Sequence, residues 1–176
     1  MAELTPDETL LGLLAANANY GYQLLNCFRD PTQLGRVWNM SNSQVYAVLK
    51  RLQQKGLITG REVTAPDAPA RTEYCLTEAG VYRLDAWLDA EPSASIHFVR
   101  VEFASRLYIA RLLNLPTLEI VRRQKETCHS LRDNLSAERA NAEPGLDWLM
   151  LDAEIELLDA MLRWLDRCEL IPNDAE

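Results

Sequence analysis

The segment from Ser41 to Gly56 carries the start signal, the periodicity and the stop signal of one amphipathic helix. Ser41 is a favourable N-cap residue, and Gln44, three residues later, can complete a capping box. Gly56 ends the pattern, as a glycine directly after a helix commonly does. Between these signals, apolar residues recur at the spacing of one helix face: Val45, Val48, Leu49 and Leu52. A helix with a single apolar stripe must bury it against neighbouring elements, so the surrounding sequence has to supply them.

Helical patterns lie before this segment, and a hairpin pattern follows it. Leucines at helical spacing predict helices over 7–18 and 22–30. Two runs rich in β-branched or aromatic residues, 57–63 and 71–76, flank a turn that contains prolines, which is the pattern of a hairpin. A further helix is expected over 77–89. Three helices, a hairpin and a helix, in that order, predict a winged helix-turn-helix domain.

The second half of the chain has only helical patterns. We expect one helix over 96–114, a second that holds Pro116 in its first turn, and a third close to the C-terminus. In the third helix, apolar residues alternate in steps of three and four: Trp148, Leu151, Ile155, Leu158, Leu162 and Leu165. This stripe is too long to be hidden by one short neighbouring helix, so we assign it to the interface of a two-fold homodimer. The expected fold is mainly α with a small β-wing: a winged helix-turn-helix domain over 1–90 and an α-helical dimerisation domain over 95–172.

Residues 31–61 contain no Asp or Glu, although the chain has 26 acidic and 18 basic residues and a formal net charge of −8. That acidic average argues against unspecific binding of nucleic acid through a broad basic surface, but it permits a local basic face. The absence of acids fits a surface that lies close to phosphates. A solvated helix that lacks Glu by chance is the alternative that composition leaves open. The cations in the stretch are Arg36, Lys50, Arg51, Lys55 and Arg61.

With its apolar stripe buried, the helix after Ser41 turns hydrogen-bonding and cationic side chains outward. Polar groups near the N-terminus of a helix and cations further along suit the major groove of DNA, where the former read base edges and the latter pair with phosphates. We expect Gln44 and Tyr46 to act near bases. Lys50 and Arg61 should act mainly on phosphates. The predicted DNA-binding residues are Ser41, Asn42, Ser43, Gln44, Tyr46, Lys50, Arg61 and Arg71.

Other kinds of chemistry have little support in the sequence. Two histidines, no Gly-rich phosphate loop and no nucleophile elbow argue against an enzyme. Four widely separated cysteines without a CxxC pair have poor spacing for a metal site, and we expect neither a metal nor a cofactor. The chain does not open with a basic signal-peptide region, and no apolar run approaches the roughly 20 residues of a membrane span. A cytoplasmic protein without membrane contact is therefore expected.

Three segments resemble the PadR family of transcriptional regulators: Gly21-Tyr22, Gln44-Val45-Tyr46 and Leu76-Thr77-Glu78-Ala79-Gly80. The resemblance covers about the first 90 residues, and the helical second half resembles the C-terminal domain of the larger, virulence-activator type of member. It implies a repressor that binds double-stranded DNA at a pseudo-palindromic operator, as a homodimer joined by its C-terminal helices. The wing is less basic here than is usual in the family.

The resemblance also implies, for some members, a small aromatic effector bound near the dimer core. Core packing is the other role open to the tryptophans of the last helix. The rival to DNA binding is a protein-interaction module, in which the winged helix and the last helix both bind protein partners. The residues expected to contribute to an effector cavity are Phe98, Phe103, Tyr108, Trp148 and Trp164.

Overall fold

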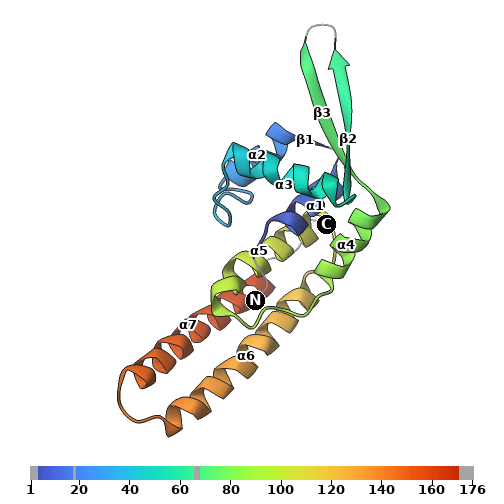
Figure 1. Ribbon diagram of the computed structural model, residues 1–176. Helices are drawn as coiled ribbons and strands as arrows, with labels where there is room; N and C mark the ends of the chain where they lie inside the picture. Colours follow the sequence, from blue (N-terminus) through green and yellow to red (C-terminus); the bar gives the residue numbers. More distant parts are fainter. Residues whose placement is uncertain (1–3, 18, 66–67, 171–176) are drawn as a thin grey trace. The chain divides into compact units, whose positions relative to one another are not determined.

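The computed structural model describes residues 4–17, 19–65 and 68–170, and within it the chain divides into two compact units (Figure 1). The N-terminal unit comprises the chain up to Ala90 together with Tyr108–Leu115. The C-terminal unit comprises Glu91–Leu107 and the chain from Pro116 on. Helix α5 (Ile96–Leu112) therefore contributes its first turns to the C-terminal unit and its last turn to the N-terminal unit.

The N-terminal unit combines helices with an antiparallel sheet in which β3 lies between β1 and β2. The two long strands, β2 and β3, form the wing that Figure 1 shows as a projecting ribbon. This arrangement confirms the predicted mainly helical fold with a winged helix-turn-helix and a small β-wing. In chain order the elements are α1 (Asp7–Ala16), β1 (Asn19–Tyr20), α2 (Gly21–Arg29), α3 (Asn42–Gln54), β2 (Ile58–Ala65), β3 (Ala68–Leu76) and α4 (Glu78–Leu88).

Helix α3 is bounded by the signals that the sequence contains. The Ser41 hydroxyl accepts a hydrogen bond from the Gln44 backbone N–H at 3.3 Å, and the Gln44 side-chain oxygen accepts one from the Ser41 N–H at 2.8 Å. This reciprocal pair satisfies backbone N–H groups that have no partner inside the helix. At the other end Gly56 has φ +69°, a left-handed conformation that glycine adopts without steric strain. All four apolar residues of the predicted stripe are buried.

Helix α1 forms the centre of the N-terminal core. It shares one hydrophobic cluster with side chains from α2, α3 and α4, and its own leucines are at most 4% exposed. Gly12 lets the last turn of α5 approach closely, because a Cβ at this position would lie 2.3 Å from Cγ2 of Ile109. The buried leucines of α1 are Leu10, Leu11, Leu13 and Leu14.

Two carboxylates in the first turn of α1 tie this helix to α3 and α4. Asp7 accepts a hydrogen bond from Nε of Arg51 at 3.1 Å, and Nζ of Lys55 lies 3.5 Å from it. Glu8 accepts a hydrogen bond from Nε of Arg83 at 3.0 Å. The Asp7 side chain is only 9% exposed, so its charge is stabilised by these partners more than by water.

The sheet is larger than the sequence pattern indicates. Strand β2 runs to Ala65 and β3 begins at Ala68, so most of the segment expected as a turn belongs to the strands; residues 66–67 lie outside the described residues. Residues 19–20, which lie between the first two expected helices, pair with residues 73–74 as strand β1. Pairing through backbone hydrogen bonds does not require β-prone side chains, and this is why residue type alone misses it.

The C-terminal unit packs the first turns of α5 against α6 (Leu118–Asn141) and α7 (Leu146–Glu169). Pro116 precedes the N-cap residue of α6, and so lies before this helix rather than in its first turn as expected. Ion pairs link α6 to α7 along their length, and residue number rises along α6 as it falls along α7, so the two helices are antiparallel. These pairs are Lys125–Asp166 (2.8 Å), Arg132–Asp159 (2.5 Å) and Arg139–Asp152.

No helix in the described part of the chain is long and apolar enough to cross a membrane.

The pair between Asp7 and Arg51 provides a test of this fold. Arg51→Ala should lower the free energy of unfolding by about 1–3 kcal/mol, because it leaves a buried carboxylate with Lys55 as its remaining partner. Lys50→Ala, one position earlier and exposed, should change it by less than about 0.5 kcal/mol. Chemical denaturation followed by circular dichroism measures both values. Equal effects of the two substitutions would contradict the role assigned to Asp7.

Candidate nucleic-acid interface

The exposed face of α3 holds half of the eight residues predicted to contact DNA. Asn42, Ser43, Tyr46 and Lys50 recur at helical spacing and are all exposed. No residue of α3 is acidic. The face therefore presents hydrogen-bonding groups near the N-terminus of the helix and a cation further along it.

Gln44 is less free than the sequence pattern implies. Its Oε1 accepts the Ser41 N–H as part of the capping box, while the Ser41 hydroxyl lies 3.2 Å from that of Ser43. What Gln44 can offer to a partner is therefore its Nε2 amide group, which is a donor. A donor matches base-edge acceptors such as N7 and O6 of guanine, rather than the bidentate pair that a free Gln makes with adenine.

Three of the five cations in the acid-free stretch are paired with carboxylates from outside it. Arg51 and Lys55 pair with Asp7 of α1, and Arg61 pairs with Glu73 of β3 at 2.7 Å. The fold thus supplies the acids that the local sequence lacks. Part of the reason for the acid-free stretch is therefore structural.

Lys50 and Arg36 have no acidic partner within the described part of the chain. Lys50 is exposed on the outward face of α3 and is free to meet a phosphate. Arg61 is also exposed, but its hydrogen bond with Glu73 raises the pKa of its guanidinium and holds the side chain on the ribbon. Exposed ion pairs are weak, so a phosphate would compete with Glu73 for Arg61.

Tyr46 is packed on one side and exposed on the other. Its ring lies against the start of α2, where a Cβ at Gly21 would be 2.7 Å from the ring carbons. Glycine at this position is needed for that close approach. The contact leaves 43% of Tyr46 exposed, on the same face as Lys50.

Arg71 on β3 is held by an aromatic ring that was not among the predicted site residues. Its guanidinium carbon lies 5.6 Å from the centroid of the Tyr22 ring, within cation–π range. Tyr22 in turn stacks on Tyr20, with centroids 5.9 Å apart and an angle of 8° between the planes. The two-residue strand β1 brings these tyrosines to the wing, and so short a strand leaves no pattern that residue type reveals.

The stripe predicted for dimerisation lies in the core of the C-terminal unit, where it packs against α5 and α6 of the same chain. Helix α6 is 24 residues long and α5 adds further cover, so one chain can bury the stripe without a second copy. A direct role of the stripe in dimerisation stays a prediction. Trp148 is half-buried. The other five members are at most 8% exposed: Leu151, Ile155, Leu158, Leu162 and Leu165.

A second apolar stripe, not predicted above, is exposed along α7. We call it the outer stripe, and its members are Leu146, Leu149, Met150 and Leu157, each more than half exposed. Steps of three, four and seven residues place them on one side of the helix. The buried stripe of α7 has the same spacing. When one heptad pattern is assigned to this segment, the second stripe is therefore overlooked.

Three of the five aromatic residues expected around an effector make other contacts. In the N-terminal unit the Tyr108 hydroxyl donates a hydrogen bond to Oε1 of Gln33 at 3.1 Å. In the C-terminal unit Phe103 and Trp164 pack edge to face, with ring centroids 5.5 Å apart. These contacts agree with core packing, and an effector cavity stays a prediction.

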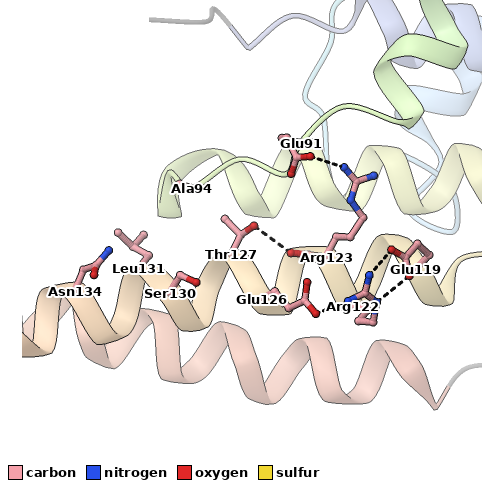
Figure 2. Close-up of a pocket in the computed structure, with 10 residues that line it drawn as sticks. All are labelled: Glu91, Ala94, Glu119, Arg122, Arg123, Glu126, Thr127, Ser130, Leu131 and Asn134. Carbon is pink, nitrogen blue, oxygen red and sulfur yellow. Dashed lines mark hydrogen bonds and ion pairs between the residues drawn. The ribbon is translucent and has the colours of Figure 1, made fainter.

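A polar pocket of about 520 Å³ lies in the C-terminal unit, between α6 and the segment that leads into α5 (Figure 2). Figure 2 shows Arg123 reaching Glu91, and Arg122 lying between Glu119 and Glu126; the first pair is 3.0 Å apart. The two carboxylates raise the pKa of Arg122. Because both arginines already have acidic partners, the pocket offers a ligand little uncompensated charge.

Within residues 4–17, 19–65 and 68–170, no group of three His, Cys, Asp or Glu side chains is placed to hold a metal ion. The four cysteines are free thiols. Burial raises the pKa of Cys27 and of Cys128, so these two stay protonated and weakly nucleophilic.

Comparison with known sequences identifies the N-terminal unit. Residues 10–86 match the transcriptional regulator PadR-like family, a range that runs from α1 through the wing into α4. A curated relative, the negative transcriptional regulator PadR of Bacillus subtilis (strain 168), is 34% identical over 79 residues, which are 45% of this chain and 42% of the relative. The match therefore spans less than half the length of that relative.

Solved structures of the family overlay partially on this chain. The structure of Bacillus subtilis PadR in complex with operator DNA is 25% identical, with a TM-score of 0.48 over 93% of this chain and 96% of that one. A PadR-like transcriptional regulator from Bacillus cereus is 17% identical, with a TM-score of 0.45 over 96% of this chain and 95% of that one. The similarity to the family rests on the two sequence matches. Residues 10–86 of the N-terminal unit are therefore similar to a PadR-like domain, and this similarity covers less than half of the chain.

Proposed function

We propose that this chain is a sequence-specific DNA-binding repressor in which α3 enters the major groove. The observation that carries the proposal is the charge pattern of α3. Its partnered cation Arg51 is bound to α1, whereas Lys50 lies on the exposed face beside neutral hydrogen-bonding groups. The cation of such a face attracts phosphates, and the face has no carboxylate that would repel them at close range. The Bacillus subtilis relative is a negative regulator, which supports repression rather than activation.

A protein-interaction module, the rival function, differs from a DNA-binding repressor in its dependence on salt. Binding of DNA through Lys and Arg releases counterions, so log K falls linearly with the logarithm of the salt concentration. A winged helix that binds only protein has no such affinity for DNA. Mobility-shift titrations at several salt concentrations separate the two functions, using a duplex that the wild-type protein selects from a random-sequence library.

Lys50→Ala should weaken binding to all DNA sequences to a similar extent and flatten the salt dependence. The slope of log K against log salt should fall by about 0.9 for each subunit, because one phosphate contact is lost. Lys55→Ala is the matched control, since this lysine is the C-cap residue of the same helix but pairs with Asp7. Its slope should equal that of the wild type. Equal slopes for Lys50→Ala and the wild type would remove Lys50 from the interface.

Gln44→Ala should reduce affinity for the selected duplex by roughly 1–3 kcal/mol and leave affinity for random DNA nearly unchanged, because it removes a base-edge donor. It also removes half of the capping box, so a second variant is needed. Gln44→Glu keeps an acceptor for the Ser41 N–H and lacks the amide donor. Competition binding with both duplexes measures the discrimination. If Gln44→Glu retains the preference of the wild type, Gln44 does not read a base.

We propose that the outer stripe of α7 packs against the same stripe of a second copy to form a homodimer. An exposed apolar stripe along a helix usually marks an interface, and a two-fold axis brings identical residues together. The pseudo-palindromic operator that the resemblance implies needs two reading helices, about 34 Å or one turn of DNA apart. In such a dimer the buried stripe would contribute indirectly, because it packs α7 against α6 of the same chain.

Two adjacent leucines separate this interface from the core. Leu157→Asp places a charge on the outer stripe and should give a folded monomer. Leu158→Asp buries a charge at a position that is 1% exposed, and should unfold the C-terminal unit at a cost of several kcal/mol. Light scattering at micromolar concentration measures the mass, and circular dichroism measures the melting. A Leu157→Asp protein that stays dimeric would contradict the proposed interface.

A small aromatic effector that binds the C-terminal unit and weakens DNA binding completes the proposed function. Its support is the family resemblance, together with Phe103, Trp148 and Trp164 in this unit. Tryptophan fluorescence reports binding of a compound, and mobility shifts report its effect on DNA. For a coupled effector, the compound lowers the affinity for DNA by the same factor by which DNA lowers the affinity for the compound.

A further inference from the structure

We propose that Tyr22 is a positioning residue that holds Arg71 on strand β3 of the wing, where Arg71 contacts a DNA phosphate. The inference rests on the proposed DNA-binding function and adds a second phosphate contact to that of Lys50. It assigns a role to a tyrosine at the start of α2 and to an arginine on a wing that carries few cations. Both side chains are exposed.

The sheet places these two residues together. Strand β1 pairs Asn19 with Tyr74 and Tyr20 with Glu73, which brings the start of α2 next to β3. The guanidinium carbon of Arg71 then lies 5.6 Å from the centroid of the Tyr22 ring. The stack on Tyr20, with planes 8° apart, restricts the orientation of the Tyr22 ring. Tyr22 is therefore an oriented surface for the guanidinium.

The charge of Arg71 is not cancelled by the carboxylates of the wing. Glu73 lies two positions further along β3 and pairs with Arg61 at 2.7 Å. Glu62 of β2 is opposite Thr72, so strand alternation turns it to the other face of the ribbon. Among the described residues Arg71 has no acidic partner, and Tyr22 holds the guanidinium without neutralising it. The arrangement leaves a full positive charge available to a phosphate.

The same segment also contacts the reading helix. Gly21, directly before Tyr22, is the residue on which the Tyr46 ring of α3 lies. The start of α2 therefore touches both the exposed face of α3 and Arg71 of β3. A long arginine side chain loses conformational entropy when it is fixed on DNA, and holding it beforehand reduces that loss. Because exposed cation–π contacts are weak, the expected gain in affinity is about two- to fivefold for each subunit.

Affinity and salt slope on the selected duplex test the proposal, with four variants compared with the wild-type protein. Arg71→Ala should lower the slope by about 0.9 for each subunit. Tyr22→Leu, which loses the ring, should weaken binding about two- to fivefold for each subunit, and Tyr22→Phe, which keeps it, should bind like the wild type. The double variant Tyr22→Leu/Arg71→Ala should bind no more weakly than Arg71→Ala alone, because Tyr22 acts through Arg71.

A measurement on the free protein shows the contact without DNA. The ring current of Tyr22 should shift the side-chain NMR resonances of Arg71, and the shift should disappear in Tyr22→Leu and persist in Tyr22→Phe. Two results would overturn the proposal. One is a double variant whose loss of affinity is the product of the losses of Tyr22→Leu and Arg71→Ala. The other is a Tyr22→Phe protein that binds DNA as weakly as Tyr22→Leu. If Lys50→Ala lowers the salt slope and Arg71→Ala does not, only this inference fails. If the wild-type protein has no salt-dependent affinity for DNA, both the proposed function and this inference fail.

Discussion

The N-terminal unit depends on the carboxylates at the start of α1. Asp7 meets Arg51 of α3, and Glu8 meets Arg83 of α4, so one turn of one helix orients two others around the leucine core. A buried ion pair adds little net stability over an apolar contact, but an arrangement that leaves either carboxylate without its partner is strongly disfavoured. The pairs therefore act chiefly by excluding other placements of α3. The outward face of α3 follows from this, because its opposite side is both packed and ion-paired.

The acid-free stretch has two physical causes that act on opposite sides of the same helix. Toward the core, Arg51 and Lys55 balance Asp7, and an additional acid there would compete with that buried carboxylate. On the exposed face, Lys50 has neutral neighbours, which suits a surface that approaches phosphates. A protein with a net charge of −8 can therefore have a DNA-binding face, because only local charge acts at contact distance. The match of residues 10–86 to a family of transcriptional regulators also agrees with the expectation that the chain is not an enzyme.

In the C-terminal unit, α7 is apolar on two sides. Antiparallel ion pairs with α6 fix which side is covered, and the outer stripe is left exposed. The two stripes share one heptad-like spacing, so the sequence shows a helix that packs strongly without showing on which side. Leu157 and Leu158 illustrate the point: they are neighbours of the same type, yet the first is exposed and the second is in the core.

The sequence by itself determined the features that depend on neighbouring residues. The capping box of Ser41 and Gln44, the buried stripe of α3 and the order of helices and wing were all predictable, because N-caps, periodicity and turns act over a few positions. The motifs that carry the family resemblance are equally local. They lie within residues 10–86, which match the PadR-like family.

Only the tertiary structure decided which of the predicted side chains are free to act. Asp7 is 44 positions from Arg51, and Tyr22 reaches Arg71 through a strand of two residues. The side-chain oxygen of Gln44 accepts the Ser41 N–H in the capping box, and Arg61 pairs with Glu73 on the neighbouring strand. Such partners are chosen by how the chain packs, and packing joins residues whose separation along the chain leaves no periodic signal.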